Sequence, residues 1–263
     1  MKKINTLLRE RIGMSQGEEI EFDNLHVILP QLAKELPFEN LCIIENRTSE
    51  LTEENLAHKF FTRNEGGVCY ELNSLLYLFL VENNFDVKLV RGVIYENENN
   101  KWNDIGKTHV AILVNYKEKT YLIDTGFGGN LPLKPVPLTG EEVQSSNGDF
   151  RVSKIKTEHG NYIFEMKVRN KDRDWKWGYA FDAWESIREI GKLNEVQDII
   201  VNHPQSPFNK KPLITRLTDE GNVTATEQSF TEWKDGKMTK KEMNRKEFEK
   251  LIQNYFGLKK VKI

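Results

Sequence analysis

The chain has 263 residues, 38% of them hydrophobic and 10% aromatic, which is enough to bury a substantial core. Thirty-eight basic and forty acidic residues leave a formal charge of −2, so the composition indicates neither a nucleic acid nor a membrane surface as partner. No apolar run approaches the roughly 20 residues that span a bilayer, and the first residues do not resemble a secretory signal. We therefore expect a globular cytoplasmic protein.

The chain has two cysteines, Cys42 and Cys69. A reducing compartment argues against a structural disulfide between them, so we expect free thiols. The five histidines and two cysteines show no spacing typical of zinc ligands, and no metal is expected.

Three regions differ in their apolar periodicity. The first is helical, with apolar residues at helical spacing in 19–36, 52–64 and 71–84. Short β-branched and aromatic runs follow and predict strands of an antiparallel sheet or small barrel at 87–95, 108–116, 119–127, 149–157 and 161–168. The last region predicts a helix at 181–204, strands within 211–228 and 229–239, and a final helix at 240–257.

The most informative window is NEGGVCYELN at 64–73, where two glycines lead into Cys69 at the start of an apolar helix. A helix N-terminus has unpaired N–H groups and the positive end of the dipole, which favours thiolate over thiol. The same N–H groups suit an oxyanion, and glycines let a substrate approach the backbone. The alternative is that Cys69 is a small buried hydrophobe beside a simple turn.

Two further residues complete a possible triad. His109 begins a strand after a polar loop and is a candidate base, while Asp124 ends the next strand before the glycine-rich TGFGG segment. A carboxylate one hairpin away from an imidazole can orient it and stabilise its charged form. Each residue alone also fits a structural role, His109 as a strand histidine and Asp124 as a turn residue.

Two other residues are assigned structural roles. Cys42 lacks a glycine turn beside it and is expected in the core. His203, in the segment NHPQSPF at 202–208, is expected to pack in a proline-bounded turn.

Beyond these individual residues, the chain resembles the arylamine N-acetyltransferases over almost its full length. The resemblance rests on GGVCYE at 66–71, His109 on its strand, DTGFG at 124–128, LPFENL at 36–41 and HPQSPF at 203–208. It implies an α+β fold with a helical domain at 1–85, an antiparallel β-barrel domain at 86–195 and an α/β lid at 196–263. The implied catalytic core is like that of cysteine proteases.

The resemblance also implies the chemistry. Cys69 is the implied nucleophile, His109 the implied base and Asp124 the residue that orients His109. The implied donor is acetyl-CoA, and the implied acceptors are small aromatic amines, hydrazines or sulfonamides, as in xenobiotic metabolism. The pyrophosphate of CoA is expected near Thr108 and the backbone of Gly126, Phe127 and Gly128, because a glycine-rich loop can hold phosphate. Phe38 and Phe127 are expected to line the acceptor pocket.

One residue departs from the family pattern. Arginine usually precedes the two glycines, whereas this chain has Glu65. A carboxylate facing the thiolate would weaken the nucleophile, but Glu65 can also bond locally while Arg63 supplies positive charge.

Three other functions use the same residues. A cysteine hydrolase or transglutaminase-like enzyme has the same triad with water or lysine as acceptor. An amide synthase takes its acyl group from a carrier protein. A binding module keeps the fold without the chemistry.

Overall fold

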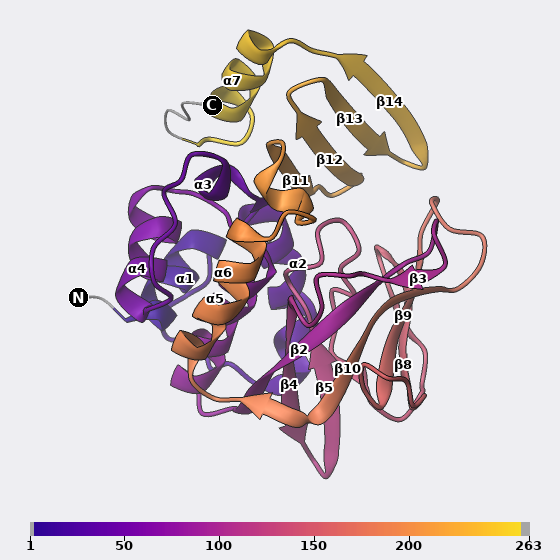
Figure 1. The fold of residues 1–263 in the computed structure, drawn as a ribbon. Coiled ribbons are helices and arrows are strands. Elements are labelled where there is room, and N and C mark those ends of the chain that lie inside the picture. Colours follow the sequence, from indigo (N-terminus) through magenta and orange to yellow (C-terminus); the bar gives the residue numbers. More distant parts are fainter. Residues whose placement is uncertain (1–2, 259–263) are drawn as a thin grey trace.

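The computed structural model describes residues 3–258, and it forms a helical part, a barrel-like sheet and a smaller sheet with a terminal helix (Figure 1). The α-helices are α1 (Ile4–Ile12), α2 (Leu25–Glu35), α3 (Leu41–Ile44), α4 (Glu53–Ala57), α5 (Cys69–Glu82), α6 (Asn194–Asn202) and α7 (Arg245–Asn254). Short helical turns are η1 (Phe22–Asn24), η2 (His58–Thr62), η3 (Ile190–Leu193) and η4 (Pro207–Asn209).

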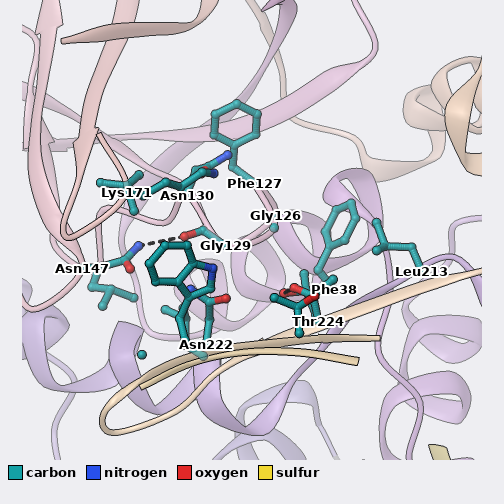
Figure 2. A pocket seen from close by; sticks show the side chains of 18 of the residues that line it. Phe38, Gly126, Phe127, Gly129, Asn130, Asn147, Lys171, Leu213, Asn222 and Thr224 are labelled. Carbon is teal, nitrogen blue, oxygen red and sulfur yellow. Dashed lines mark hydrogen bonds between the residues drawn. The ribbon is translucent and has the colours of Figure 1, made fainter. Parts of the chain in front are cut away.

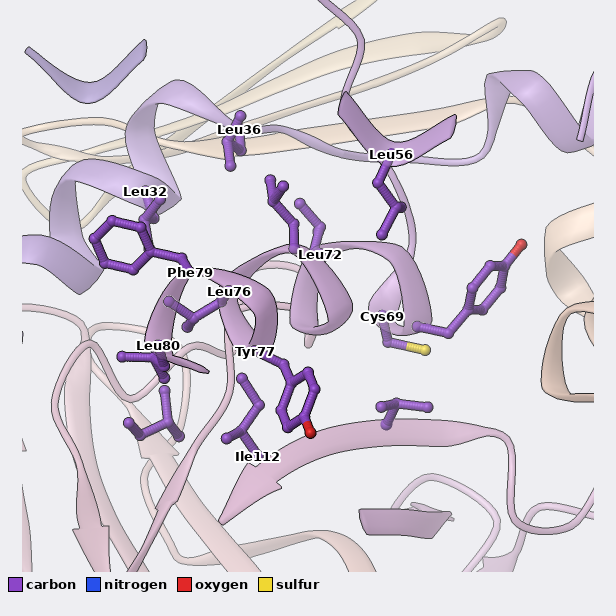
Figure 3. Close-up of a cluster of buried hydrophobic side chains, with 14 of the residues drawn as sticks. Leu32, Leu36, Leu56, Cys69, Leu72, Leu76, Tyr77, Phe79, Leu80 and Ile112 are labelled. Atoms are coloured by element: carbon purple, nitrogen blue, oxygen red, sulfur yellow. The ribbon is translucent and has the colours of Figure 1, made fainter. Parts of the chain in front are cut away.

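The central helix of the molecule is α5. Most of its apolar side chains are buried, among them Leu72, Leu75, Leu76, Phe79 and Leu80, which is the pattern of a helix inside a core. Figure 3 shows Leu72, Leu76 and Leu80 on this helix, with Leu32 of α2 and Ile112 of a neighbouring strand around it. The helix ends at Glu82, where the Asn83 side chain caps the Phe79 carbonyl (2.7 Å). Because Cys69 is the first residue of α5, this core fixes its position.

The barrel-like sheet is antiparallel throughout. Its strand order is β6-β5-β4-β2-β10-β9-β8-β7, with β3 paired to β2, and β6 approaches β8 so that the sheet nearly closes. The strands are β2 (Asp86–Glu96), β3 (Lys101–Trp102), β4 (His109–Tyr116), β5 (Lys119–Ile123), β6 (Val136–Pro137), β7 (Val143–Ser145), β8 (Gly148–Ser153), β9 (Tyr162–Val168) and β10 (Lys176–Ile187). A second apolar core, including Phe150, Phe164 and Phe181, fills its interior.

The smaller sheet joins both ends of the chain. Its order is β1-β11-β12-β13-β14, so β1 (Phe38–Glu39), which lies between two N-terminal helices, pairs with the C-terminal β11 (Leu213–Leu217). The remaining strands are β12 (Gly221–Thr226), β13 (Ser229–Lys234) and β14 (Lys237–Glu242). Helix α7 covers one face through Phe248 and Ile252, and the other face looks toward the barrel.

The predicted α+β class, with helices first and an antiparallel barrel-like sheet next, is confirmed. The helix predicted over 181–204 is wrong in its first part, because residues up to Ile187 belong to β10 and the helix α6 begins only at Asn194. The final helix is also shorter than predicted: it begins at Arg245, and residues 240–242 belong to β14. Helix α1 was not predicted. The domain boundaries at residues 85 and 195 remain a proposal.

Candidate functional site

Cys69 is held at the first turn of α5 by a buried ion pair. The Glu71 carboxylate accepts the Val68 N–H (3.0 Å) and pairs with the Lys59 ammonium, and both side chains are buried. The Cys69 Sγ lies 3.5 Å from the carbonyl oxygen of Thr108, the residue just before β4. The N–H of Cys69 donates no hydrogen bond within residues 3–258, so it points an unused donor at the site.

His109 and Asp124 meet because their strands are antiparallel neighbours. His109 is the first residue of β4 and Asp124 directly follows β5, so both lie at the same end of the sheet. Nε2 of His109 lies 2.7 Å from Oδ2 of Asp124, which leaves Nδ1 for the thiol of Cys69. All three side chains are at most 5% exposed. The structure therefore brings together the three residues of the predicted triad.

Asp124 is fixed by three further donors. Its Oδ1 accepts from the Asn73 side chain (3.0 Å) and from the Gly126 N–H (2.8 Å), while Oδ2 accepts from the Tyr179 hydroxyl (2.9 Å). With four hydrogen bonds to it, the carboxylate has one orientation. Asn73 and Tyr179 were not predicted, although a buried asparagine four residues after Cys69 on an apolar helix requires polar partners.

The environment of His109 favours its charged form. Burial lowers the pKa of this imidazole, but the charge and hydrogen bond of Asp124, together with Cys69, outweigh burial and raise the pKa to about 10. The imidazole is therefore protonated at neutral pH. The charged imidazole lies beside the Cys69 side chain.

A cavity of about 890 Å³ opens from Cys69 and His109 and runs between the barrel and the smaller sheet (Figure 2). One set of wall residues is apolar: Phe38, Ile94, Ile105, Phe127, Ile200, Phe208 and Leu213. The Phe38 and Phe208 rings meet edge to face at 5.6 Å. Polar and charged wall residues include Thr224, Thr231, Asn147, Arg169 and Lys171.

All the residues predicted to bind ligand, namely Thr108, Gly126, Phe127, Gly128 and Phe38, line this cavity. Phe208, five residues after His203 in the segment at 202–208, also lines the cavity and was not predicted. His203 is not part of the wall; its Nδ1 accepts the Gln205 N–H (3.2 Å) in the turn after α6.

Glu65 bonds locally and does not face the thiol of Cys69. Its carboxylate pairs with Arg63 (2.9 Å) and Arg47 (3.2 Å), and it accepts a hydrogen bond from the Cys42 thiol (3.3 Å). Burial, together with nearby carboxylates, raises the pKa of the Cys42 thiol to about 12 against the opposing charge of Lys59. Cys42 is therefore an un-ionised core residue, as predicted.

Glu39 carries a carboxyl group that is 1% exposed. Its Oε2 accepts the Leu41 N–H (2.6 Å), but Oε1 has no partner within residues 3–258. Burial raises the pKa of Glu39 to about 7, although Lys59 opposes the shift. The folded protein therefore binds this proton more tightly than the unfolded chain does.

Glu39→Gln is expected to flatten the pH dependence of stability. Because the folded pKa is raised, the contribution of Glu39 is complete below pH ~4.5 and is lost as pH rises through about 7. In wild type, the free energy of unfolding should therefore fall between pH 5 and pH 8. In the variant this fall should be smaller by about 2–3 kcal/mol. Urea unfolding at both pH values measures this, with the exposed Glu98→Gln as control. Parallel curves for wild type and Glu39→Gln would contradict it.

Within residues 3–258, no three histidine, cysteine, aspartate or glutamate side chains are grouped so that they could hold a metal ion. Across the same residues, no helix is long and apolar enough to cross a membrane.

Comparison with known proteins agrees with this fold and site. A family model described as N-acetyltransferase matches residues 21–262, which places the chain in the class of acetyl-transferring enzymes. An uncharacterized acetyltransferase of Bacillus subtilis, YvcN, is 36% identical, covering 97% of this chain and all of the relative. The chain belongs to the arylamine N-acetyltransferase family and is an acyltransferase.

Solved structures show the same fold. An arylamine N-acetyltransferase from Bacillus cereus, described as having a unique Cys-His-Glu catalytic triad, superposes with a TM-score of 0.92 at 40% identity, covering 99% of this chain and all of the other. A Mycobacterium marinum arylamine N-acetyltransferase in complex with CoA has a TM-score of 0.82 at 23% identity, covering 96% and 92%. At 23% identity, the likeness to the Mycobacterium marinum structure shows the fold alone.

Proposed function

We propose that the protein transfers an acetyl group from acetyl-CoA to the nitrogen of small aromatic amines, hydrazines or sulfonamides through an acetyl-cysteine on Cys69. The observation that carries the proposal is the Cys69–His109–Asp124 arrangement at the base of one large, partly aromatic cavity. In the Bacillus cereus neighbour the third member is described as glutamate; here it is Asp124.

The first half-reaction forms the acetyl-cysteine. The Cys69 thiolate attacks the thioester carbonyl carbon, the new C–S bond forms, and the bond from that carbon to the CoA sulfur breaks. The departing CoA thiolate takes the proton of the His109 imidazolium. The unused N–H of Cys69 is placed to stabilise the oxyanion that forms in between.

The second half-reaction restores the enzyme. The amine nitrogen attacks the acetyl carbon, His109 takes one proton from that nitrogen, and Cys69 leaves as the thiolate beside the new imidazolium. Both steps pass through one cysteine, so ping-pong kinetics are expected. Donor and acceptor use the same cavity in turn.

The cavity suits both substrates. Phe38, Phe127 and Phe208 offer aromatic faces to an aryl acceptor. For the donor, the loop at Gly126, Phe127 and Gly128 beside Thr108 is the proposed pyrophosphate site. The N–H of Gly126 is engaged by Asp124, so the donors available to phosphate are those further along this loop. Acetyl-CoA and small amines are metabolites of the cytoplasm, where we place the protein.

Incubation of the purified protein with acetyl-CoA is expected to add one acetyl group to Cys69 and release one equivalent of free CoA. Intact-protein mass spectrometry with peptide mapping and thiol titration measure both products. Adding aniline-type amines, arylhydrazines or sulfonamides should then remove the acetyl group and yield the N-acetyl product. An unmodified Cys69, or acetate in place of the amide in the presence of every acceptor, would overturn the proposal.

A further inference from the structure

The cavity has a charged rim away from the candidate triad. Arg169, Asn170 and Lys171, in the turn between β9 and β10, line it together with the β13–β14 turn at Asp235 and Gly236. In Figure 2, Lys171 and Asn147 lie on the side of the pocket opposite Phe38, whose strand adjoins the glycines before Cys69. The rim therefore lies across the cavity from Phe38.

The two cations at this rim are anchored but not neutralised. The Arg169 guanidinium donates to the Ser145 carbonyl (3.1 Å), and the Lys171 ammonium donates to the Asn130 side-chain oxygen (3.3 Å). Neither forms an ion pair with a carboxylate within residues 3–258. Both side chains keep further N–H donors for a ligand.

The carboxylates that share the rim are largely occupied. Asp219 pairs with Lys34, and Glu220 pairs with Lys234 (2.6 Å). Asp235 is the rim carboxylate without such a pair in the described part of the chain, so two uncompensated cations face one uncompensated carboxylate. The balance at the rim is positive and suits an anion.

The turn that carries the cations is itself rigidly built. The Asp172 carboxylate accepts the Val168 N–H (3.0 Å) and pairs with Lys176 (2.7 Å), while the Arg169 N–H donates to the Asn147 carbonyl (2.9 Å). The Asn147 side chain in turn binds the carbonyls of Gly129 (3.0 Å) and Leu131 (2.9 Å). Arg169 and Lys171 are therefore fixed against the same loop that follows Asp124.

That loop offers backbone donors beside Lys171. The N–H groups of Gly128 and Gly129 donate no hydrogen bond within residues 3–258, and Gly128 has φ of +59°. A methyl group added at Gly129 would meet no atom within 4 Å, so the backbone is open to the cavity. Unpaired N–H groups next to a lysine form a surface on which phosphate oxygens bind.

We infer that Arg169 and Lys171 bind the 3′-phosphate of the CoA donor, beyond a pyrophosphate on the Gly128–Gly129 backbone. The inference rests on the proposed use of acetyl-CoA. The 5′-pyrophosphate and the 3′-phosphate are carried by the same ribose, so two adjoining anion sites match one nucleotide. Removing the 3′-phosphate from the donor should therefore remove the contribution of these two cations to donor binding and leave the other contacts of the donor unchanged.

The test compares acetyl-CoA with acetyl-3′-dephospho-CoA on wild type and on the double variant Arg169→Gln/Lys171→Gln. Wild type is expected to show about tenfold higher KM for the dephospho donor, since two exposed charge-assisted contacts are lost. The double variant should show that higher KM with both donors, and its kcat should stay unchanged. Arg173→Gln, which removes a charge from the same turn outside the cavity wall, should behave like wild type.

Calorimetric binding of CoA and 3′-dephospho-CoA gives a readout that does not depend on turnover. Wild type is expected to prefer CoA about tenfold, and the double variant should bind the two equally. Equal affinity in wild type, or a variant that loses the same factor with both ligands, overturns the 3′-phosphate assignment; the second result would assign the cations to the pyrophosphate. A protein that forms no acetyl-cysteine but still prefers CoA would instead refute the proposed function alone.

Discussion

Asp124→Asn is expected to lower the rate of Cys69 acetylation about 10³–10⁴-fold in a protein that remains folded. The amide oxygen can keep the hydrogen bonds from Asn73 and Gly126, which turns the amide nitrogen toward His109. Nε2 must then accept a hydrogen bond, and the imidazole proton moves to Nδ1, the nitrogen left for Cys69. In this tautomer His109 cannot take the proton of the thiol.

The same variant should lose the positive charge on His109. Asp124 is the largest influence that raises the pKa of His109 against burial, so without its charge the buried imidazole is neutral at pH 7. Iodoacetamide labelling of Cys69 at pH 6 should slow in parallel with acetylation. Rapid labelling at pH 6 in Asp124→Asn would show that the carboxylate does not support the reactivity of Cys69. The exposed Asp174→Asn is the control.

A stability measurement checks the same charge independently. Because the folded pKa of His109 lies above its ordinary value of 6.5, its contribution is complete below about pH 6.5 and is lost as pH rises through 10. In wild type, the free energy of unfolding should therefore fall between pH 7 and pH 10, and this fall should be smaller in Asp124→Asn. Equal slopes for the two proteins would contradict the elevated pKa.

The features that sequence reasoning found are those set by neighbouring residues. Cys69 was correctly placed at a helix start, because the apolar run after Gly66 and Gly67 opens with Glu71 in its first turn. His109 and Asp124 were paired because consecutive strands usually form a hairpin, and β4 and β5 do. In each case the relevant contact spans few residues.

The features that it missed depend on distant pairing. Tyr179 reaches Asp124 only because β10 pairs with β2, with Tyr179 opposite Ile94. Residues Phe181, Trp184 and Ile187 have a spacing of three that fits a helix, but Phe181 is fully buried in a strand and Trp184 is 82% exposed within the irregular stretch between Phe181 and Ser186. Tertiary pairing overrode the local pattern.

The charge at Glu65 shows a different limit. The sequence has this carboxylate four residues before Cys69, and from the sequence alone it could face either the thiol or neighbouring side chains. The Glu65 carboxylate is turned away from the thiol by its ion pairs with Arg47 and Arg63. Only Arg63 is close to Glu65 in the sequence, so the pair with Arg47 could not be predicted. A turn of backbone thus places the carboxylate beside Cys42 and away from the cavity wall.

Gly126→Ala is expected to reduce Cys69 acetylation by about 100-fold or more and to destabilise the fold by about 1–3 kcal/mol. A methyl group at this position would lie 2.5 Å from the Cys69 Cα and 2.8 Å from the Asn73 side-chain nitrogen. Neither atom can yield cheaply, because the first is helix backbone and the second binds Asp124. The change therefore separates Cys69, the proposed nucleophile, from the loop that holds the carboxylate.

A variant at a second glycine shows whether the loss of acetylation in Gly126→Ala goes beyond the effect of destabilisation alone. At Gly160 an added methyl group would lie 2.2 Å from the Phe181 backbone, a clash at least as severe, but Gly160 is not part of the cavity wall. Gly160→Ala should therefore lower the free energy of unfolding while its folded fraction acetylates Cys69 at close to the wild-type rate, and Gly17→Ala, with open space around it, should change neither. Acetylation and urea unfolding of all three variants measure both effects. If Gly126→Ala and Gly160→Ala lost activity only in proportion to their unfolded fractions, the close approach of the Gly126 backbone to Cys69 would have no catalytic role, and the glycine would serve packing alone.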